Sequence, residues 1–151
     1  MNKLREKIFA WILKRQAKRQ VVIPQWQKVR SVVVLYPNDN IKHIIKQIEG
    51  AQKEVVVFTM PNKKEIDWLT ERPKKEIREF ISARKFDVLI DLTQEPSRTM
   101  KYMAMDIRAD FKVGRFIQEG IHDLTIDTPS QATPDYLFEQ IVKYIEMFGG
   151  K

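Results

Sequence analysis

The sequence predicts an α/β protein with an open, mostly parallel sheet of about five strands, helices on both faces, and a basic amphipathic helix in front. Three runs of β-branched and aromatic residues, SVVVLY, EVVVFT and FDVLIDL, lack the alternation of half-exposed strands. Such runs are typical of strands that are buried on both faces. Because segments with helical spacing separate them, we expect right-handed crossovers and a three-layer, Rossmann-like domain.

Composition shifts divide the chain into three segments. Residues 1–20 are expected to form the basic helix, residues 21–30 an extended connection, and residues 31–151 the α/β domain. Pro24 supports the connection because it has no backbone N–H and disfavours helical geometry in Ile23.

Within the domain, strands and helices are expected to alternate. The strands are expected at residues 31–36, 54–59, 86–92, 111–114 and 123–127. The helices are expected near residues 41–50, 74–84, 96–107 and 134–148. Asn38 or Asp39 is a candidate cap for the first of these helices, and Gly50 is expected to end it. Residues 61–73 are expected to form a short helix or a loop.

The positive charge is concentrated at the N-terminus. The formal net charge is +7, and residues 1–20 hold seven of the 27 basic residues but one of the 20 acidic residues. The rest of the chain is therefore nearly neutral. On a helix, four lysines gather on one side and the apolar residues cover a broad opposite arc. The candidate membrane- or partner-binding residues are Lys3, Lys7, Trp11, Lys14, Arg15, Lys18 and Arg19.

Three interpretations of this basic helix remain open. Its apolar face can pack on its own domain or against a second copy in a homodimer. It can instead adsorb to an anionic membrane surface or bind a protein partner, since Trp and Phe on one face and lysines on the other are typical of interfacial helices. It can also bind RNA or the ribosome, although the rest of the chain has no stripe of lysines and arginines interleaved with aromatic residues.

Several classes of protein are not expected. The chain has no cysteine, so disulfides, thiolate metal sites and cysteine nucleophiles are excluded. No apolar run approaches the ~20 residues of a membrane-spanning helix, and the N-terminus lacks a signal-peptide pattern. We therefore expect a cytoplasmic protein that can lie peripherally at the inner membrane.

In open parallel sheets, ligands bind where the strands end, so the residues that follow each strand are the candidate ligand site. These candidates are Asn38, Asp39, Asp91, Thr93, Gly114 and Arg115. Asp39 and Asp91 can act as bases or bind hydroxyls, or they can satisfy backbone N–H groups at turns. Arg115 can bind an anion or pair with a carboxylate.

The same region lacks the usual signatures of catalysis. No glycine follows the first strand, so neither a dinucleotide fingerprint nor a phosphate loop is present, and no cofactor is expected. A metal site is not expected, because it would need the two histidines, His43 and His122, to converge with a carboxylate. No serine lies in a nucleophile elbow. The sequence predicts a non-catalytic binding or adapter protein.

The segments YPNDNIKHI, FDVLIDL and ADFKVGRF resemble a family of small uncharacterised bacterial proteins, in which a basic N-terminal helix precedes an α/β domain. More distantly, the chain is similar to the N-terminal half of heptosyltransferase-type glycosyltransferases. That resemblance implies a sugar- or nucleotide-binding domain with Asp39 in the place of a catalytic aspartate. Those enzymes hold the nucleotide-sugar mainly in a second domain, and we expect no segment of this sequence to form one.

Overall fold

The computed structural model describes residues 2–15, 21–115, 117, 119–129 and 131–150, and it contains one five-stranded parallel sheet. Its strands are β1 (Ser31–Leu35), β2 (Glu54–Phe58), β3 (Lys85–Asp91), β4 (Arg108–Arg115) and β5 (Leu124–Ile126). They lie in the order β2-β1-β3-β4-β5, and each neighbouring pair is parallel. This is a common doubly wound order. The connection after β1 leads to one edge of the sheet and the connection after β3 leads toward the other edge, so the order reverses between these two strands.

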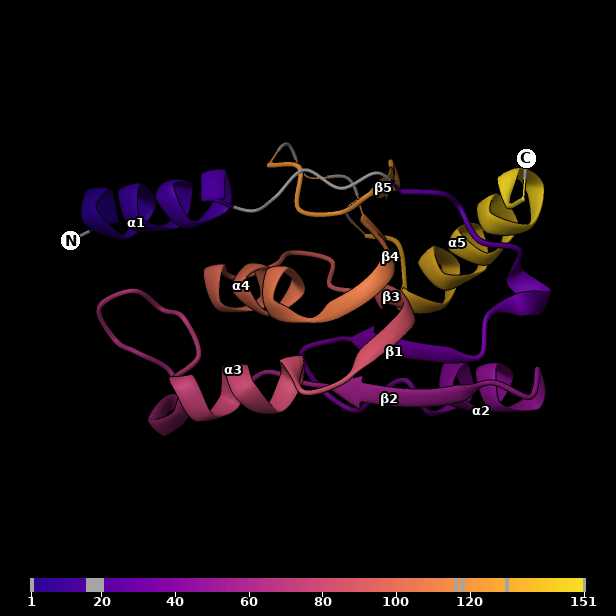
Figure 1. Cartoon of the computed structure of the whole chain (residues 1–151), viewed down its shortest axis with the longest axis horizontal. Helices are drawn as coiled ribbons and strands as arrows, with labels where there is room; N and C mark the ends of the chain where they lie inside the picture. Colours follow the sequence, from indigo (N-terminus) through magenta and orange to yellow (C-terminus); the bar gives the residue numbers. More distant parts are fainter. Residues whose placement is uncertain (1, 16–20, 116, 118, 130, 151) are drawn as a thin grey trace.

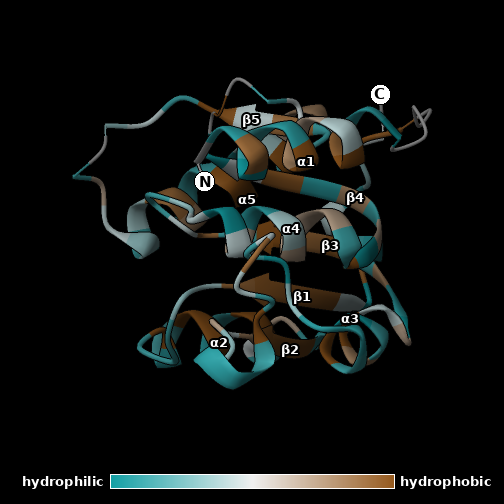
Figure 2. Ribbon diagram, turned by 90° about the vertical axis from the view of Figure 1, so that its left-hand side faces the viewer, coloured by the Kyte–Doolittle hydropathy of each residue, from teal (hydrophilic) through white to brown (hydrophobic). Residues whose placement is uncertain are grey.

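Helices cover both faces of the sheet, as predicted (Figures 1 and 2). They are α1 (Asn2–Arg15), α2 (Lys42–Gly50), α3 (Lys75–Ser82), α4 (Arg98–Asp106) and α5 (Pro134–Phe148). One hydrophobic cluster joins α2 and α5 to the first face of the sheet, and another joins α1, α3 and α4 to the second face. The three-layer α/β architecture is therefore confirmed.

The position of each strand in the sheet explains how far its side chains are buried. Val32 to Leu35 in β1 and Val88 to Asp91 in β3 are buried, because both strands are central. The prediction of burial on both faces is wrong for β2, whose residues Val55 to Phe58 are half-buried. β2 is an edge strand with a neighbour on one side, so its apolar side chains remain partly open to solvent.

The connection between α1 and the domain is fixed to the body rather than simply extended. It contains a short 3-10 helix, Trp26–Lys28, and the buried Lys53 donates hydrogen bonds to the carbonyls of Trp26 and Val29. Burial lowers the pKa of Lys53, and the nearby Arg30 lowers it further. No helix in the described part of the chain is long and apolar enough to cross a membrane.

Candidate functional site

The described part of the basic segment, helix α1, packs on its own domain. Phe9 is 8% exposed and meets the ring of Tyr102 edge to face, with 5.2 Å between the ring centroids. Ile12 and Leu13, one turn further along, pack against the same cluster. The apolar side of the helix is therefore used inside the molecule.

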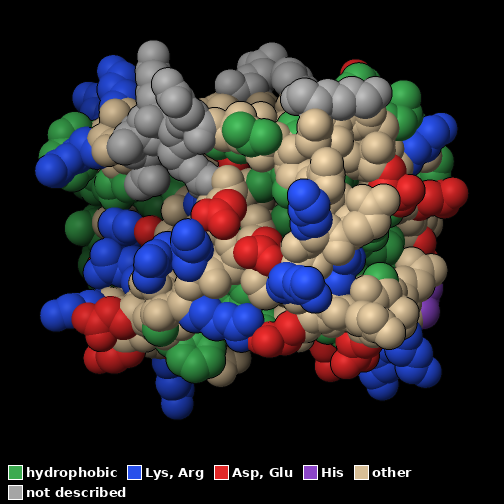
Figure 3. Space-filling model, turned by 45° about the vertical axis from the view of Figure 1, so that its right-hand side comes forward, with side chains coloured by type: hydrophobic (Ala, Val, Ile, Leu, Met, Phe, Trp, Pro, Cys, Tyr) green, Lys and Arg blue, Asp and Glu red, His purple; other side chains and the backbone are tan. Residues whose placement is uncertain are grey.

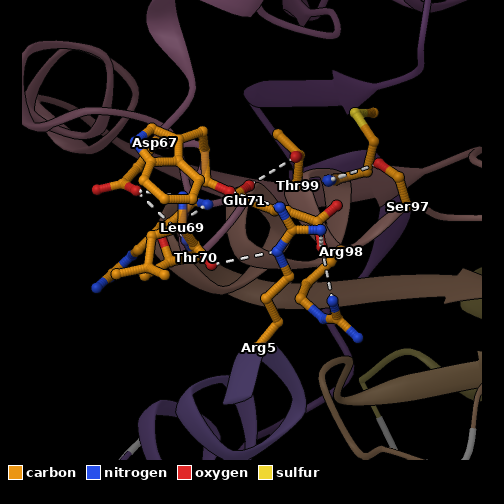
Figure 4. Close-up of polar contacts among 11 residues, drawn as sticks. Arg5, Asp67, Leu69, Thr70, Glu71, Ser97, Arg98 and Thr99 are labelled. Carbon is orange, nitrogen blue, oxygen red and sulfur yellow. Dashed lines mark hydrogen bonds and ion pairs between the residues drawn. The ribbon is translucent and has the colours of Figure 1, made fainter. Parts of the chain in front are cut away.

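A polar network fixes the other end of α1 (Figure 4). Arg5 donates hydrogen bonds to the carbonyls of Trp68 and Leu69, at 2.6 and 3.3 Å. Its guanidinium also lies 3.6 Å from Glu71, which accepts a 2.6 Å hydrogen bond from Arg98 at the start of α4. Arg5 and Phe9 lie four residues apart on one helix face, so α1 is held by an apolar and a polar contact on the same side.

The opposite side of α1 carries cations and two apolar residues, and we call it the outer face. It is formed by the exposed residues Lys3, Leu4, Lys7, Trp11, Lys14 and Arg15. Trp11 is 58% exposed, and the Arg15 guanidinium lies 4.7 Å from the centre of its ring. The candidates Lys18 and Arg19 lie outside the described residues. On the face of the molecule drawn in Figure 3, basic and acidic side chains are interspersed.

At the carboxyl end of the sheet, Asp91 pairs with His122. Asp91 is the last residue of β3, and its Oδ2 lies 2.8 Å from Nε2 of His122, with both side chains at most 5% exposed. The other carboxylate oxygen of Asp91 accepts a hydrogen bond from the backbone N–H of Thr93. Asp91 thus accepts a hydrogen bond from a backbone N–H group in a turn, which is one of its two predicted roles. Through His122 it also fixes the loop before β5.

Gly114 makes the Asp91–His122 pair possible. A Cβ at position 114 would lie 2.8 Å from Nε2 of His122, so the imidazole ring rests directly on the glycine. His122 was not among the sequence-predicted site residues. A glycine inside a strand often marks a close approach by another group, and this signal in the FKVG segment could have revealed the contact.

Thr93 and Arg115 lie beside this pair and tie loops together. Arg115 donates to the carbonyls of Gln94 and Thr128, so its hydrogen-bond partners in the described part of the chain are backbone oxygens rather than a carboxylate. Thr93 Oγ1 and His122 Nδ1 are buried without hydrogen-bond partners in the described part of the chain. Thr93 also lines a cavity of about 160 Å³ between the loops that follow β1 and β3. That volume is well below the ~300 Å³ of ordinary ligand pockets.

Asn38 and Asp39 do not cap α2, which corrects the sequence expectation. Asn38 Oδ1 accepts a hydrogen bond from the backbone N–H of Asn40, forming a local turn. The cap position of α2 is Ile41, which provides no side-chain hydrogen bond. The cap position lies two residues after Asp39 and three after Asn38, so neither residue stands where its side chain would cap the free N–H groups.

The two histidines lie on different parts of the fold. His43, on α2, contacts Asp135 of α5 at 2.5 Å, whereas His122 is buried beside Gly114. Among the described residues, no three histidine or acidic side chains form a group that could hold a metal ion.

The fold and these contacts define a doubly wound α/β domain with a basic helix docked on one sheet face. Residues 5–148 match the model of a family of unknown function (DUF6913), and the chain belongs to this family. The resemblance to an uncharacterised family is therefore confirmed. No curated protein and no solved structure matches the chain, and nothing supports the glycosyltransferase resemblance.

Proposed function

We propose that this protein is a non-catalytic adapter that docks on an anionic membrane surface through the outer face of α1. One observation carries the proposal: Phe9 and Arg5 bind α1 to the domain, and this contact turns its lysines and Trp11 outward. The helix does not need to detach from the domain to present these residues.

The charge of the outer face supports an anionic target. Each basic residue near such a surface contributes about 1 kcal/mol, and the outer face holds Lys3, Lys7, Lys14 and Arg15. An exposed tryptophan adds an apolar ring with a polar N–H, a combination that favours the headgroup region. Since the cytoplasmic leaflet is the anionic one, we place the protein at the cytoplasmic face of the inner membrane.

Two other functions have less support. An RNA- or ribosome-binding role would use the same outer face, but Trp11 is its one aromatic ring, and base stacking needs several. A sugar- or nucleotide-binding role would use the carboxyl end of the sheet. There the cavity of about 160 Å³ is small and Asp39 lies exposed on a loop without glycine.

The proposal is tested by co-sedimentation of the full chain with vesicles of phosphatidylcholine, with and without phosphatidylglycerol. Wild type should bind the anionic vesicles, and less so as salt is added. Replacing Lys3, Lys7 and Lys14 together by Gln should weaken binding about a hundredfold, because three contributions of ~1 kcal/mol are lost.

The matched control replaces Lys28, Lys42 and Lys46 by Gln, which removes the same charge from exposed positions on the 3-10 helix Trp26–Lys28 and on α2. This variant should bind like wild type. Equal loss in both triple variants would mean general charge attraction and would refute the docking face, and so would equal binding to neutral vesicles. Binding to ribosomes but not to vesicles would favour the RNA alternative. Point variants are preferable to removing residues 1–20, because truncation would expose the ring of Tyr102.

A further inference from the structure

A second surface lies on the opposite face of the sheet from α1. It is a groove of about 640 Å³ between α2 and α5, and we call it the α5 groove. His43 and Gln47 of α2 form one wall, and a stripe along the whole of α5 forms the other wall and the floor. α1 belongs to the other hydrophobic cluster, so both surfaces can be occupied at once.

The floor of the groove is apolar and partly open. Phe138 and Val142, four residues apart on α5, line it together with Met147, which is 48% exposed. Exposed apolar side chains collected in this way along one helix indicate a binding surface more often than scattered single residues do.

The rim of the groove is mainly acidic. Asp135, Glu139 and Glu146 contribute three carboxylates, and Lys143 is the one lysine or arginine among the residues described as lining the groove. Asp135 is paired with His43. Glu139 and Glu146 lie two turns apart on the same side of α5, so they suit cations spaced along a partner helix.

We propose that the α5 groove binds a basic amphipathic helix of a partner protein. The apolar stripe of that helix would cover Phe138, Val142 and Met147, and its lysines or arginines would face Glu139 and Glu146. Amphipathic helices bind grooves of this kind through apolar residues at helical spacing. α5 has 15 residues, so at 1.5 Å per residue the groove accommodates a helix of about 22 Å.

A second copy of this chain is a poorer occupant, for two reasons. In a twofold pair of antiparallel α5 helices centred near Val142, Glu139 of one copy would face Glu146 of the other, and like charges repel. The basic helix α1 of another copy also cannot serve, because Phe9, its most buried apolar residue, is already packed on its own domain.

The probe is a synthetic peptide of about four helical turns, with leucines on one face and lysines on the other, labelled for fluorescence anisotropy. The full-length protein should bind it and should not bind the same peptide with glutamates in place of lysines. The double variant Glu139→Lys, Glu146→Lys should weaken binding about tenfold or more. Val142→Asp should weaken it as well, because a charge would enter the apolar floor.

The matched control is Glu76→Lys, Glu79→Lys on α3, which makes the same charge change on the other sheet face. It should keep wild-type affinity, and so should the variant with Lys3, Lys7 and Lys14 replaced by Gln, which separates this groove from membrane docking. Equal weakening by the α3 variant would overturn the proposal, as would unchanged binding by the α5 variant. A homodimer in analytical ultracentrifugation that Val142→Asp dissociates would also overturn it, because a second copy would then be the occupant.

Discussion

The contact between Gly114 and His122 gives a sharp prediction about stability. In Gly114→Ala, the new Cβ would lie 2.8 Å from Nε2 and 3.0 Å from Cδ2 and Cε1 of the imidazole ring. Ordinary contact begins at 3.4 Å, so the ring must retreat by about 0.6 Å. All three atoms belong to one rigid and buried ring, so no flexible end of a side chain can absorb the movement.

The magnitude follows from what the ring would lose. Overpacking a buried site costs about 1–3 kcal/mol, and a displaced ring would lengthen its 2.8 Å bond to Asp91. We therefore expect Gly114→Ala to lower the free energy of unfolding by about 2 kcal/mol. The backbone of Gly114 does not need the left-handed region, so steric overlap is the expected cause.

Urea unfolding of a double-mutant cycle tests this reasoning. In a His122→Ala background, the ring is gone and Gly114→Ala should cost less than about 0.5 kcal/mol. The cost of leaving Asp91 unpaired is common to both members of that comparison and cancels. An unchanged urea midpoint for Gly114→Ala alone, or an equal loss in both backgrounds, would refute the contact.

Two further predictions concern a buried tyrosine and a close backbone contact of a glycine. Tyr102→Phe should raise the free energy of unfolding by about 1 kcal/mol, because Tyr102 Oη is buried without a hydrogen-bond partner in the described part of the chain. Burial also raises the pKa of Tyr102 above 10.0, so the unfolded chain loses this proton first, and stability should fall as the pH rises through the folded-state pKa. Urea unfolding at alkaline pH should therefore show a fall in the free energy of unfolding in wild type that is absent in Tyr102→Phe. Gly149→Ala should cost about 1–3 kcal/mol, since a Cβ there would overlap the carbonyl oxygen of Pro24. Gly50→Ala is the matched control, because a Cβ at that helical position meets no atom within 4 Å, and thermal unfolding should show a gain of about 0.5–1 kcal/mol.

The strands could be predicted because strands buried on both faces have continuous runs of apolar residues. SVVVLY and FDVLIDL became the central strands β1 and β3, where both faces are covered. EVVVFT is similarly rich in β-branched and aromatic residues but forms the edge strand β2. Strand order depends on which crossover passes over which face, and apolar content alone does not encode it.

The candidate site was predictable in part for a similar reason. Asp91, Thr93, Gly114 and Arg115 lie together because the strands are parallel and end at one edge. The partner of Asp91 was not predictable, since His122 lies 31 residues further along and reaches Asp91 through the loop between β4 and β5. Spacing patterns describe helices and strands, whereas this contact depends on the path of a loop.

The location of α1 could not be predicted from its composition, and it changes what the basic segment can do. An interfacial helix inserts its apolar face into the membrane, but here Phe9 contacts Tyr102 and is unavailable. The proposed membrane contact would therefore use the lysines, Arg15 and the exposed Trp11, and it would be mainly electrostatic. Binding of this kind is reversible and weakens as salt is added.

A second binding surface would lengthen the time that such a weakly bound protein stays at a membrane. If that surface binds another protein at the membrane, the two linked contacts raise the effective concentration of each other. The outer face of α1 is basic and the α5 groove is mainly acidic, and they lie on opposite faces of the sheet. Such an arrangement allows an adapter to bind two different partners without bringing them into competition.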